Sequence, residues 1–458
     1  MFGPGGSNSA ALTGATVSVY NAGQAAATFL AGWLANRISR KYTLTVAAAV
    51  AIVGIILQTA AVDIGMFIAG RLITGAASGI ALTVVPVYIA ELSKPGSRAI
   101  LVGFQGMAIA IGFFIANWIG YSGIYAHGNL QWRIPLATQF FFPLILLIGS
   151  VFLPFSPRWL VTRERYEDAK KVLVDIFGDT DLAEQQLAEI REQITLEATY
   201  TGKGWWETFK MLFWKQYRLR VFLACFIQFQ TQWGGVGVLQ NFQNVFYKQV
   251  GIAGNYAELI DGFYGFMGVF GQLANLFVVA DRLGRRTTLW CGCLVLTVIL
   301  SVAMAMSAQF AQKTNHAAAR TTIGFIYMYS AFFALFFNST MWVLPSELLP
   351  VFLRSQGMGL STFTLGVSSI VVSQITPYAL DGIGWRFYAI FIAITALSTL
   401  IYYFVLPETK GKHLEEIGAL FGDVSAINDM DNLKKKEFES KGVHVEHTTG
   451  EIHSYKVR

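Results

Sequence analysis

The feature that most constrains this chain is a series of long apolar stretches, each with at most one acidic or basic residue. Since a helix needs about 20 apolar residues to cross about 30 Å of hydrocarbon, stretches of this length can span a bilayer. They are too long and too uniformly apolar for β-barrel strands, and helices satisfy every backbone polar group within lipid. The sequence therefore predicts an all-α membrane protein with eleven spans, at about 13–35, 43–62, 66–90, 99–122, 134–155, 221–247, 260–280, 288–308, 322–345, 356–380 and 385–406.

The composition and charge pattern point to the lipid bilayer as a partner and not to nucleic acid. Only 14% of the 458 residues are charged, whereas a soluble protein is about 25% charged. The net charge of +6 comes from bases gathered in alternate short loops, as the positive-inside rule expects. The three cysteines lie within apolar stretches and the six histidines outside them. We therefore expect no metal site and no cofactor, and no span holds an enzyme-like set of groups.

The loops divide the chain into domains. Loops rich in lysine and arginine are expected in the cytoplasm, and they lie at 36–41, 94–98, 156–220, 282–286, at 354 and after 407. This places the N-terminus outside and the C-terminus inside. Residues 156–220 carry apolar residues at helical spacing among many charges, which predicts two to four amphipathic helices. The expected domains are a five-span bundle (1–155), a cytoplasmic helical linker (156–220), a six-span bundle (221–406) and a cytoplasmic tail (407–458).

The two bundles are related in sequence. LANRISRKYTL at 34–44 aligns with VADRLGRRTTL at 279–289, and YIAELSKPGSR at 88–98 aligns with LPSELLPVFLR at 344–354. The exits FLPFSPRWL and VLPETKGKHL also match loosely. Landmarks in the same order at nearly one offset indicate a duplicated bundle, and two parallel helical repeats with a site between them are a transporter architecture.

These motifs resemble those of the sugar porter family of the major facilitator superfamily, especially the fungal sugar permeases, from about residue 11 to about residue 420. The resemblance rests on five motifs, namely GRLITGAASGIALTVVPVYIAEL, SPRWL, QWGGVG, DRLGRR and PETKGKHLEEI. It implies a major facilitator fold of two six-helix bundles with both termini in the cytoplasm. Compared with that pattern the chain lacks the first helix, and residues 1–12 resemble the loop that follows it. The count of five plus six spans agrees with this interpretation.

The resemblance implies a latch of ion pairs at the cytoplasmic ends of the helices, holding the outward-open state. Its members would be Asp281, Arg282, Arg285, Arg286, Glu347, Arg354 and Glu408 in the second half, and Arg37, Arg40, Glu91, Arg98 and Arg158 in the first half. In the first half, the latch acid is replaced by Asn36 and the glycine by Ser39. The alternative is that these are ordinary positive-inside loops with no switching role.

Arg71 is the one base well within a predicted span. An intramembrane charge costs about 2.5–3.5 kcal/mol on insertion scales and needs a partner or a use. By resemblance, the matching arginine of proton-coupled sugar porters works with an aspartate of the first helix. Because that helix is not found here, we expect Arg71 to lack its partner and proton coupling to be impaired. The alternative is an arginine that reaches water near the external end of its span.

A sugar site needs uncharged hydrogen-bonding groups and an aromatic face. In the sixth span Gln228, Thr231 and Gln232 stand at i, i+3 and i+4 and share one face. The nearby glycines permit local unwinding beside a substrate; interhelical polar packing is the alternative. The full set of expected substrate-binding residues adds Asn241 and Asn338, with Gln105 and Trp342 included by family position.

The leading hypothesis is a secondary carrier, acting as a monomer in the plasma membrane, that moves a mono- or disaccharide by rocking of two bundles. Proton coupling is implied by the family. Thr231 and Gly237 replace polar residues usual in hexose porters, and Val269 and Leu365 stand at two further polar positions, so a wider or less polar site fits as well. The alternatives are a sugar-sensing receptor of the same fold and a truncated, non-functional carrier.

Overall fold

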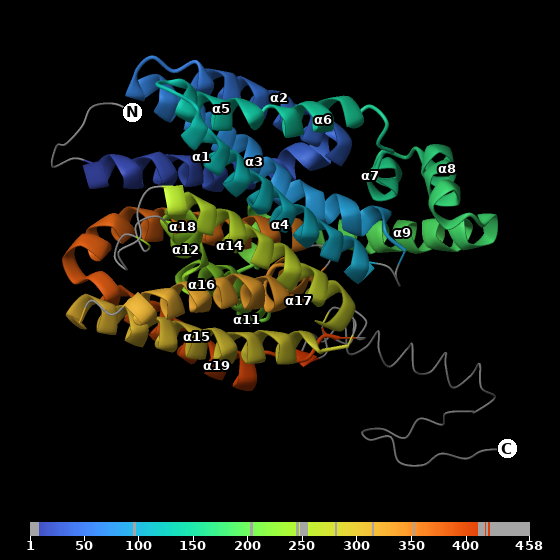
Figure 1. Cartoon of the computed structure of the whole chain (residues 1–458). Coiled ribbons are helices and arrows are strands. Elements are labelled where there is room, and N and C mark those ends of the chain that lie inside the picture. Colours follow the sequence, from blue (N-terminus) through green and yellow to red (C-terminus); the bar gives the residue numbers. More distant parts are fainter. Residues whose placement is uncertain are drawn as a thin grey trace, which may run out of the picture.

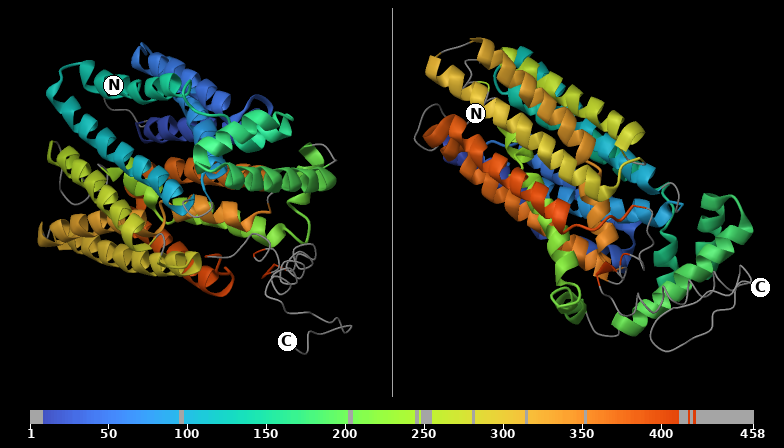
Figure 2. Two further views of the ribbon diagram at one scale, coloured as in Figure 1. Left: turned by 90° about the vertical axis from the view of Figure 1, so that its right-hand side faces the viewer. Right: turned by 90° about the horizontal axis from the view of Figure 1, so that it is seen from below.

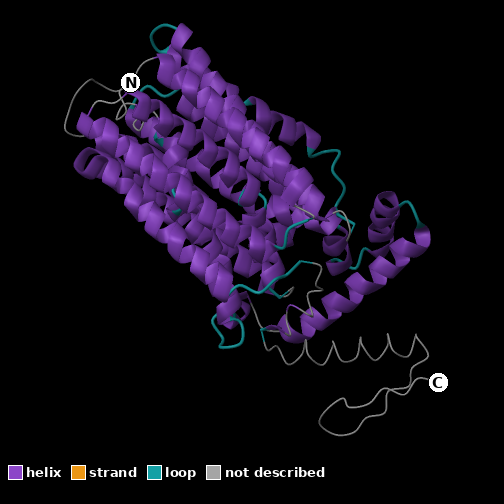
Figure 3. Ribbon diagram, turned by 60° about the horizontal axis from the view of Figure 1, so that its bottom comes forward, coloured by secondary structure: helices purple, strands orange, loops and turns teal. Residues whose placement is uncertain are grey.

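The computed structural model describes residues 9–94, 98–201, 205–243, 247, 255–279, 282–313, 316–350, 353–410, 417 and 420–421. All regular secondary structure within these ranges is helical, as the apolar stretches predict (Figure 3). The helices form two bundles, with the first coloured blue to teal and the second green to red (Figure 1).

The first bundle is organised around a close contact between its first and third helices. A β-carbon on Gly75 would lie 2.0 Å from the carbonyl oxygen of Tyr20, so the two backbones approach as only small residues allow. The helix with Gly75 begins where Asp63 accepts a hydrogen bond from the Met66 backbone, an N-cap. The helices are α1 (Ser9–Ile38), α2 (Arg40–Thr59), α3 (Ile64–Leu92), α4 (Arg98–Ser122), the short η1 (Gly123–Tyr125), α5 (Leu130–Thr138) and α6 (Phe141–Gly149).

Four helices follow between the bundles, within the predicted range of two to four. Ser156 caps the first of them, with Pro157 directly after it, a favoured helix start. Lys170 and Glu184 then join the second and third by a 2.5 Å ion pair, and this hydrogen bond raises the pKa of Lys170. The four are α7 (Pro157–Thr162), α8 (Tyr166–Phe177), α9 (Thr180–Thr201) and α10 (Trp205–Met211).

These linker helices lie at one end of both bundles (Figure 2). We call this the linker end, and the sequence predicts that it faces the cytoplasm. The second bundle comprises α11 (Arg218–Trp233), α12 (Val236–Asn241), α14 (Asn255–Ala274) with a π-helical turn η2 (Asn275–Val279), α15 (Arg285–Lys313), α16 (His316–Phe336), α17 (Thr340–Leu348), α18 (Arg354–Ile383), η4 (Gly384–Phe387) and α19 (Tyr388–Phe404).

Nine helical segments among the described residues are long and apolar enough to cross a membrane. The other two predicted spans correspond to α1, a 30-residue helix, and to the pair α11 and α12, which a break divides. The count of eleven spans therefore stays a prediction. The chain is an integral, multi-pass membrane protein.

The two bundles contact each other along two helix pairs, α1 with α18 and α4 with α14. In the first pair, the side chains of Asn21 and Ser373 meet at 3.3 Å. In the second, the Asn117 amide donates to the carbonyl of Asp261 at 2.9 Å. Aromatic rings also pack across both interfaces, with ring centres 4.6 Å apart for Phe29 and Phe363 and 6.1 Å apart for Trp118 and Phe263, and the apolar core of the second half lies inside its own bundle.

Candidate functional site

The break between α11 and α12 is the first element of the site. Gly235 has a φ of 100°, a left-handed conformation, and a β-carbon there would lie 3.2 Å from the Phe391 ring. The Tyr329 hydroxyl donates to the Gly234 carbonyl at 2.9 Å, which satisfies a backbone group freed by the break. The glycines predicted to permit unwinding therefore do end the helix within the bundle.

Two of the predicted glutamines on α11 present buried atoms without partners. Gln228 is fully buried, and its amide nitrogen donates to the Met341 carbonyl at 3.0 Å, but its Oε1 accepts no hydrogen bond. The Oε1 of Gln232 is likewise buried and unpartnered. An unsatisfied buried acceptor costs about 1–3 kcal/mol, so each needs an explanation such as a ligand or an ordered water.

The other two predicted polar residues of this region have local partners. The buried hydroxyl of Thr231 donates to the Ile227 carbonyl of its own helix at 2.8 Å. Asn241 is exposed, and its amide donates to the Gly237 carbonyl at 2.8 Å. Unlike the two glutamines, Thr231 and Asn241 therefore have donors that are already satisfied within their own helical segments.

Trp342 lies beside Gln228, because Gln228 is bonded to the carbonyl of the preceding residue. Its side chain is 3% exposed, and its indole Nε1 is a buried donor without a partner. A donor and an acceptor, both unsatisfied, thus lie on neighbouring helices α17 and α11. A hydroxyl group offers both roles and matches such a pair.

Asn338, in the break between α16 and α17, takes part in a network that sequence reasoning missed. Its amide donates to the Gly106 carbonyl of α4 at 2.9 Å and to the Gln272 Oε1 at 3.0 Å. Gln272 donates in turn to the Ser339 hydroxyl at 2.8 Å. One signal was present in the sequence, since Gln272 and Asn275 stand at i and i+3 within the predicted span 260–280.

This network holds α4 against the second bundle and places Gln105 next to it. A β-carbon on Gly106 would lie 2.8 Å from the Ser339 hydroxyl, so α4 passes very close. The Oε1 of the adjacent Gln105 is buried and unpartnered. Elements from both bundles (α4, α11 and α17) therefore carry unsatisfied polar atoms, those of Gln105, Gln228, Gln232 and Trp342.

Arg71 lies against aromatic rings. Its guanidinium carbon is 5.9 Å from the Tyr20 ring centre and 5.5 Å from that of Phe67, within the range of cation–π attraction. Its Nε is buried without a hydrogen bond, and no ion pair to Arg71 occurs among the described residues.

At the linker end of the first bundle, three motifs meet at one carboxylate. Arg40 pairs with Glu91 at 2.9 Å, with side chains only 10% and 11% exposed. The Ser156 hydroxyl, which caps α7, donates to the other oxygen of Glu91 at 2.5 Å. The pair therefore ties α2 and α3 to the linker. Arg37 is exposed and lies over the Trp33 ring.

The second bundle repeats this arrangement. Arg285 lies 3.8 Å from Glu347, and the Thr409 hydroxyl donates to Glu347 at 2.8 Å. Glu408 accepts from the Arg285 backbone N–H at 2.7 Å, at the N-terminus of α15, where negative charge is favoured. Arg286 donates to the Tyr403 carbonyl.

The five remaining predicted latch residues differ in their exposure and in how far the structure describes them. Arg282 is exposed. Arg158 and Arg354 are partly buried and have interactions of their own. Asp281 and the side chain of Arg98 lie outside the described residues. All pairs described here join groups within one half or to the chain that follows it.

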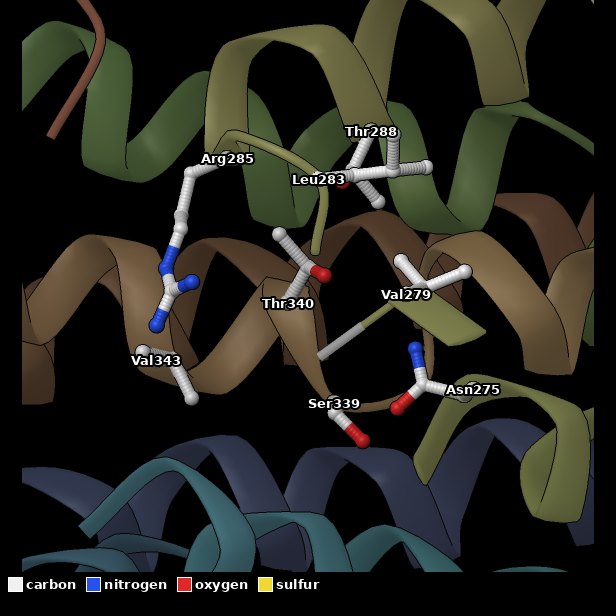
Figure 4. A pocket seen from close by; sticks show the side chains of 8 residues that line it. All are labelled: Asn275, Val279, Leu283, Arg285, Thr288, Ser339, Thr340 and Val343. Atoms are coloured by element: carbon white, nitrogen blue, oxygen red, sulfur yellow. The ribbon is translucent and has the colours of Figure 1, made fainter. Parts of the chain in front are cut away.

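A small cavity of about 30 Å³ lies between the Gln272 network and Arg285 (Figure 4). Its lining residues are Asn275, Val279, Leu283, Arg285, Thr288, Ser339, Thr340 and Val343. This volume suits a water or two and is far below the several hundred Å³ typical of ligand pockets. None of the four unpartnered residues lines it, so the cavity is not the candidate substrate site.

Comparisons with known proteins agree with this architecture. The model of the family described as "Sugar (and other) transporter" matches residues 3–421. The MFS-type transporter criB of Aspergillus cristatus is 32% identical, over 95% of this chain and 90% of its own length. The sugar transporter STL1 of Saccharomyces cerevisiae is 30% identical, over 89% and 72%. A probable quinate permease of Aspergillus clavatus is also 30% identical, over 88% and 78%.

Solved structures show the same fold. The proton:xylose symporter XylE bound to 6-bromo-6-deoxy-D-glucose superposes with a TM-score of 0.78 at 23% identity, covering 90% of this chain and 89% of that one. An inward-open form of XylE from E. coli gives a TM-score of 0.71 at 22% identity, with 91% of both chains covered.

Proposed function

Because the chain belongs to the sugar (and other) transporter family, a family of carriers and not of enzymes, we propose that it moves a mono- or disaccharide across the plasma membrane. The cargo is an uncharged, polyhydroxylated molecule, carried by a secondary-active mechanism. The carrier works as a monomer, and a proton is the coupled ion, with weaker coupling than in the family because Arg71 has no acidic partner among the described residues. Support for proton coupling comes from the XylE symporter, which has the same fold.

The observation that carries this proposal is that four of the predicted sugar-site residues each have a buried polar atom without a partner. The acceptors of Gln105, Gln228 and Gln232 and the indole donor of Trp342 match the alternating donors and acceptors of sugar hydroxyls. None of them bears a charge, which suits a neutral cargo. A buried polar group is costly unless it is hydrogen-bonded, so binding of hydroxyl groups offsets a cost already present in the protein.

The way in which the bundles meet supports transport by alternating access. They contact each other along α1 with α18 and α4 with α14, whereas the ion pairs of Glu91 and Glu347 and the apolar core of the second half each lie within a single bundle. The carboxylates Glu91 and Glu347 join each bundle to the segment that follows it at the linker end. We propose that these clusters act as latches, released when the linker end opens. Asn338 and Gln272 would separate from α4 in the same movement.

The experiment that tests the function is uptake of labelled mono- and disaccharides by a transporter-null cell expressing the chain, with and without a proton gradient. We expect saturable uptake of at least one sugar, increased by an inward proton gradient. Binding of a sugar without uptake would favour a sensor. Neither binding nor uptake of any sugar would contradict the assignment.

A second candidate cargo is a polyhydroxylated acid. Arg71 has no acidic partner among the described residues, and a carboxylate on the cargo would pair with it. One relative is named as a probable quinate permease. Uptake of labelled quinate that falls at least tenfold in Arg71→Gln, with sugar uptake unchanged, would favour this cargo over a neutral sugar.

A further inference from the structure

The segment that leads from the linker into the second bundle has two faces of different chemistry. It consists of α10 and the turn before α11, at the linker end. Two backbone hydrogen bonds fix the turn, from the Trp214 N–H to the Met211 carbonyl at 3.1 Å and from the Tyr217 N–H to the Trp214 carbonyl at 2.9 Å. Met211, Leu212 and Tyr217 are buried in an apolar cluster with Leu353, at the start of α18. The inner face therefore holds the segment against the second bundle.

The same helix also contacts the first bundle. The ring centre of Phe209 in α10 is 6.4 Å from that of Phe29 in α1. Phe29 in turn lies 4.6 Å from Phe363 of α18, again between ring centres. Packing on both bundles fixes the orientation of α10, and this determines which of its side chains point outward.

The outer face carries large aromatic side chains that the described protein leaves uncovered. Trp206, Phe213 and Trp214 are 67%, 61% and 50% exposed. Neighbouring exposed apolar side chains mark an interaction surface, because their contact with water is unfavourable. Tryptophan in particular is enriched where a membrane meets water, since its apolar ring and its N–H group suit the two sides of that boundary.

This aromatic face continues onto α11. Leu219 and Phe222 are also exposed, and Phe222 lies inside the predicted span 221–247. An exposed ring within a span contacts lipid. Trp214 and Phe213 directly precede that span, so they lie at the level where the chain passes from the headgroups into the hydrocarbon.

Three exposed bases stand among the rings, Lys210, Lys215 and Arg218. None of them takes part in an ion pair among the residues that the structure describes. The only acid between positions 205 and 220 of the sequence is Glu207. Bases next to a span attract the anionic lipids of the cytoplasmic leaflet, and the charge rule places the linker end on that side.

We propose that this outer face binds anionic phospholipids of the leaflet at the linker end. We call it the aromatic–basic surface, and its members are Trp206, Lys210, Phe213, Trp214, Lys215 and Arg218. The rings lie among the headgroups and upper acyl chains, and the bases pair with the phosphate and carboxylate groups of the lipid.

Two observations favour lipid over a second copy of the chain as the occupant. The aromatic–basic surface is continuous with exposed side chains of a predicted span, and two such surfaces facing each other would bring like charges together. The surface is also separate from the four unpartnered sugar-site residues, so lipid binding there does not depend on the proposed function.

Tryptophan quenching in nanodiscs tests this with the purified full chain. The discs hold one part phosphatidylserine to three parts phosphatidylcholine, and one lipid or the other carries bromine atoms, which quench indole fluorescence on contact. Subtracting the signal of the matching Trp206→Phe/Trp214→Phe protein isolates these two residues. We expect both lipids to quench them, with phosphatidylserine enriched about threefold over its share of the disc.

Removing the charge should remove the enrichment and leave the contact with lipid. In Lys210→Gln/Lys215→Gln/Arg218→Gln we expect phosphatidylserine to quench only in proportion to its share, while phosphatidylcholine still quenches because the rings stay in the membrane. High salt should lower the enrichment in the unaltered protein, since it screens exposed charges.

The matched control is Lys171→Gln/Arg320→Gln/Arg386→Gln, which removes three exposed bases that lie elsewhere. It should keep the enrichment. Equal enrichment in the two triple variants, or no enrichment in the unaltered protein, would overturn the proposal. Absence of quenching by either lipid would also overturn it, because another part of the chain or a second copy would then cover the rings.

Discussion

At the scale of single residues, Gln228 and Gln232 stay predictions as cargo ligands, and the support for them is the buried Oε1 atom that each leaves without a partner. Gln228 and Gln232 could be predicted because amides at helical spacing in an apolar span must face protein. The sequence could not predict that the side chains of Thr231 and Asn241 donate hydrogen bonds within their own helical segments, because the side-chain rotamers decide this. Gln272 was missed because its role depends on a helix from the other bundle.

The sugar-site residues give a direct prediction. Gln232→Ala removes one acceptor for a cargo hydroxyl. Such a hydrogen bond contributes about 0.5–1.5 kcal/mol, so KM for sugar uptake should rise up to about tenfold, with ~1.4 kcal/mol per factor of ten. Initial rates over a range of sugar concentrations measure this. Gln309→Ala, an exposed amide at the end of α15, should leave KM unchanged, and an equal KM in both variants would remove Gln232 from the site.

The backbone of Ser39 is strained, which allows a second prediction about a single residue. It replaces a glycine of the family motif, and it has a φ of 88° and a ψ of 150°. A non-glycine residue in such a region costs about 1–3 kcal/mol, and the buried Ser39 hydroxyl also lacks a partner. Ser39→Gly relieves both costs, so the unfolding temperature in detergent should rise by several degrees.

The control for Ser39 is Ser122→Gly, where φ is an ordinary −60°. Glycine there gains no relief and adds chain entropy to the unfolded state, so the unfolding temperature should not rise. If both variants shifted the temperature alike, strain at Ser39 would not be the cause.

At the scale of helices, the apolar stretches predicted where the helices lie but not where they break. The stretches at 134–155, 221–247 and 322–345 each contain two helices in the structure. Lipid exposure sets the length of an apolar stretch, whereas a break depends on backbone groups finding partners in neighbouring helices, as Tyr329 provides for Gly234. Neighbours of that kind are not visible in a single sequence.

The break at Gly235 makes a prediction for α11 and α12. Gly235→Ala puts a side chain on a left-handed residue, at about 1–2 kcal/mol, and pushes against Phe391. Both stability in detergent and sugar uptake should fall. Gly324→Ala is the control, because that glycine is helical with open space around it, and alanine there favours the helix. Equal behaviour of the two variants would argue against a required break.

At the scale of the whole molecule, duplication was readable in sequence because the motifs at the linker end repeat. The structure adds that the repeat is three-dimensional, with Arg40, Glu91 and Ser156 in one half and Arg285, Glu347 and Thr409 in the other. The pairing of the bundles through α1 with α18 and α4 with α14 could not be predicted, since a single sequence does not show which apolar faces pack on a distant helix and which face lipid.

Alternating access requires the two bundles to move relative to each other, and a cross-link between them tests this. Asn21 and Ser373 lie across the α1–α18 contact, 3.3 Å apart. Cysteines at both positions, joined by a short thiol cross-linker, should stop sugar uptake, and cleavage of the linker should restore it. Cysteines in place of Gln58 and Gln139, which meet at 3.1 Å within the first bundle, should leave uptake intact when cross-linked. Uptake that persists with the bundles joined would contradict alternating access.

We propose that the chain carries an uncharged polyhydroxylated molecule that binds to Gln105, Gln228, Gln232 and Trp342. Counterflow of labelled sugars into liposomes holding only the purified protein tests it most directly, because no gradient and no other protein takes part. We predict transient, saturable accumulation of at least one sugar, lost when Gln228 and Gln232 are both replaced by alanine. Accumulation no greater than in empty liposomes for every sugar, or no change in the double variant, would contradict it.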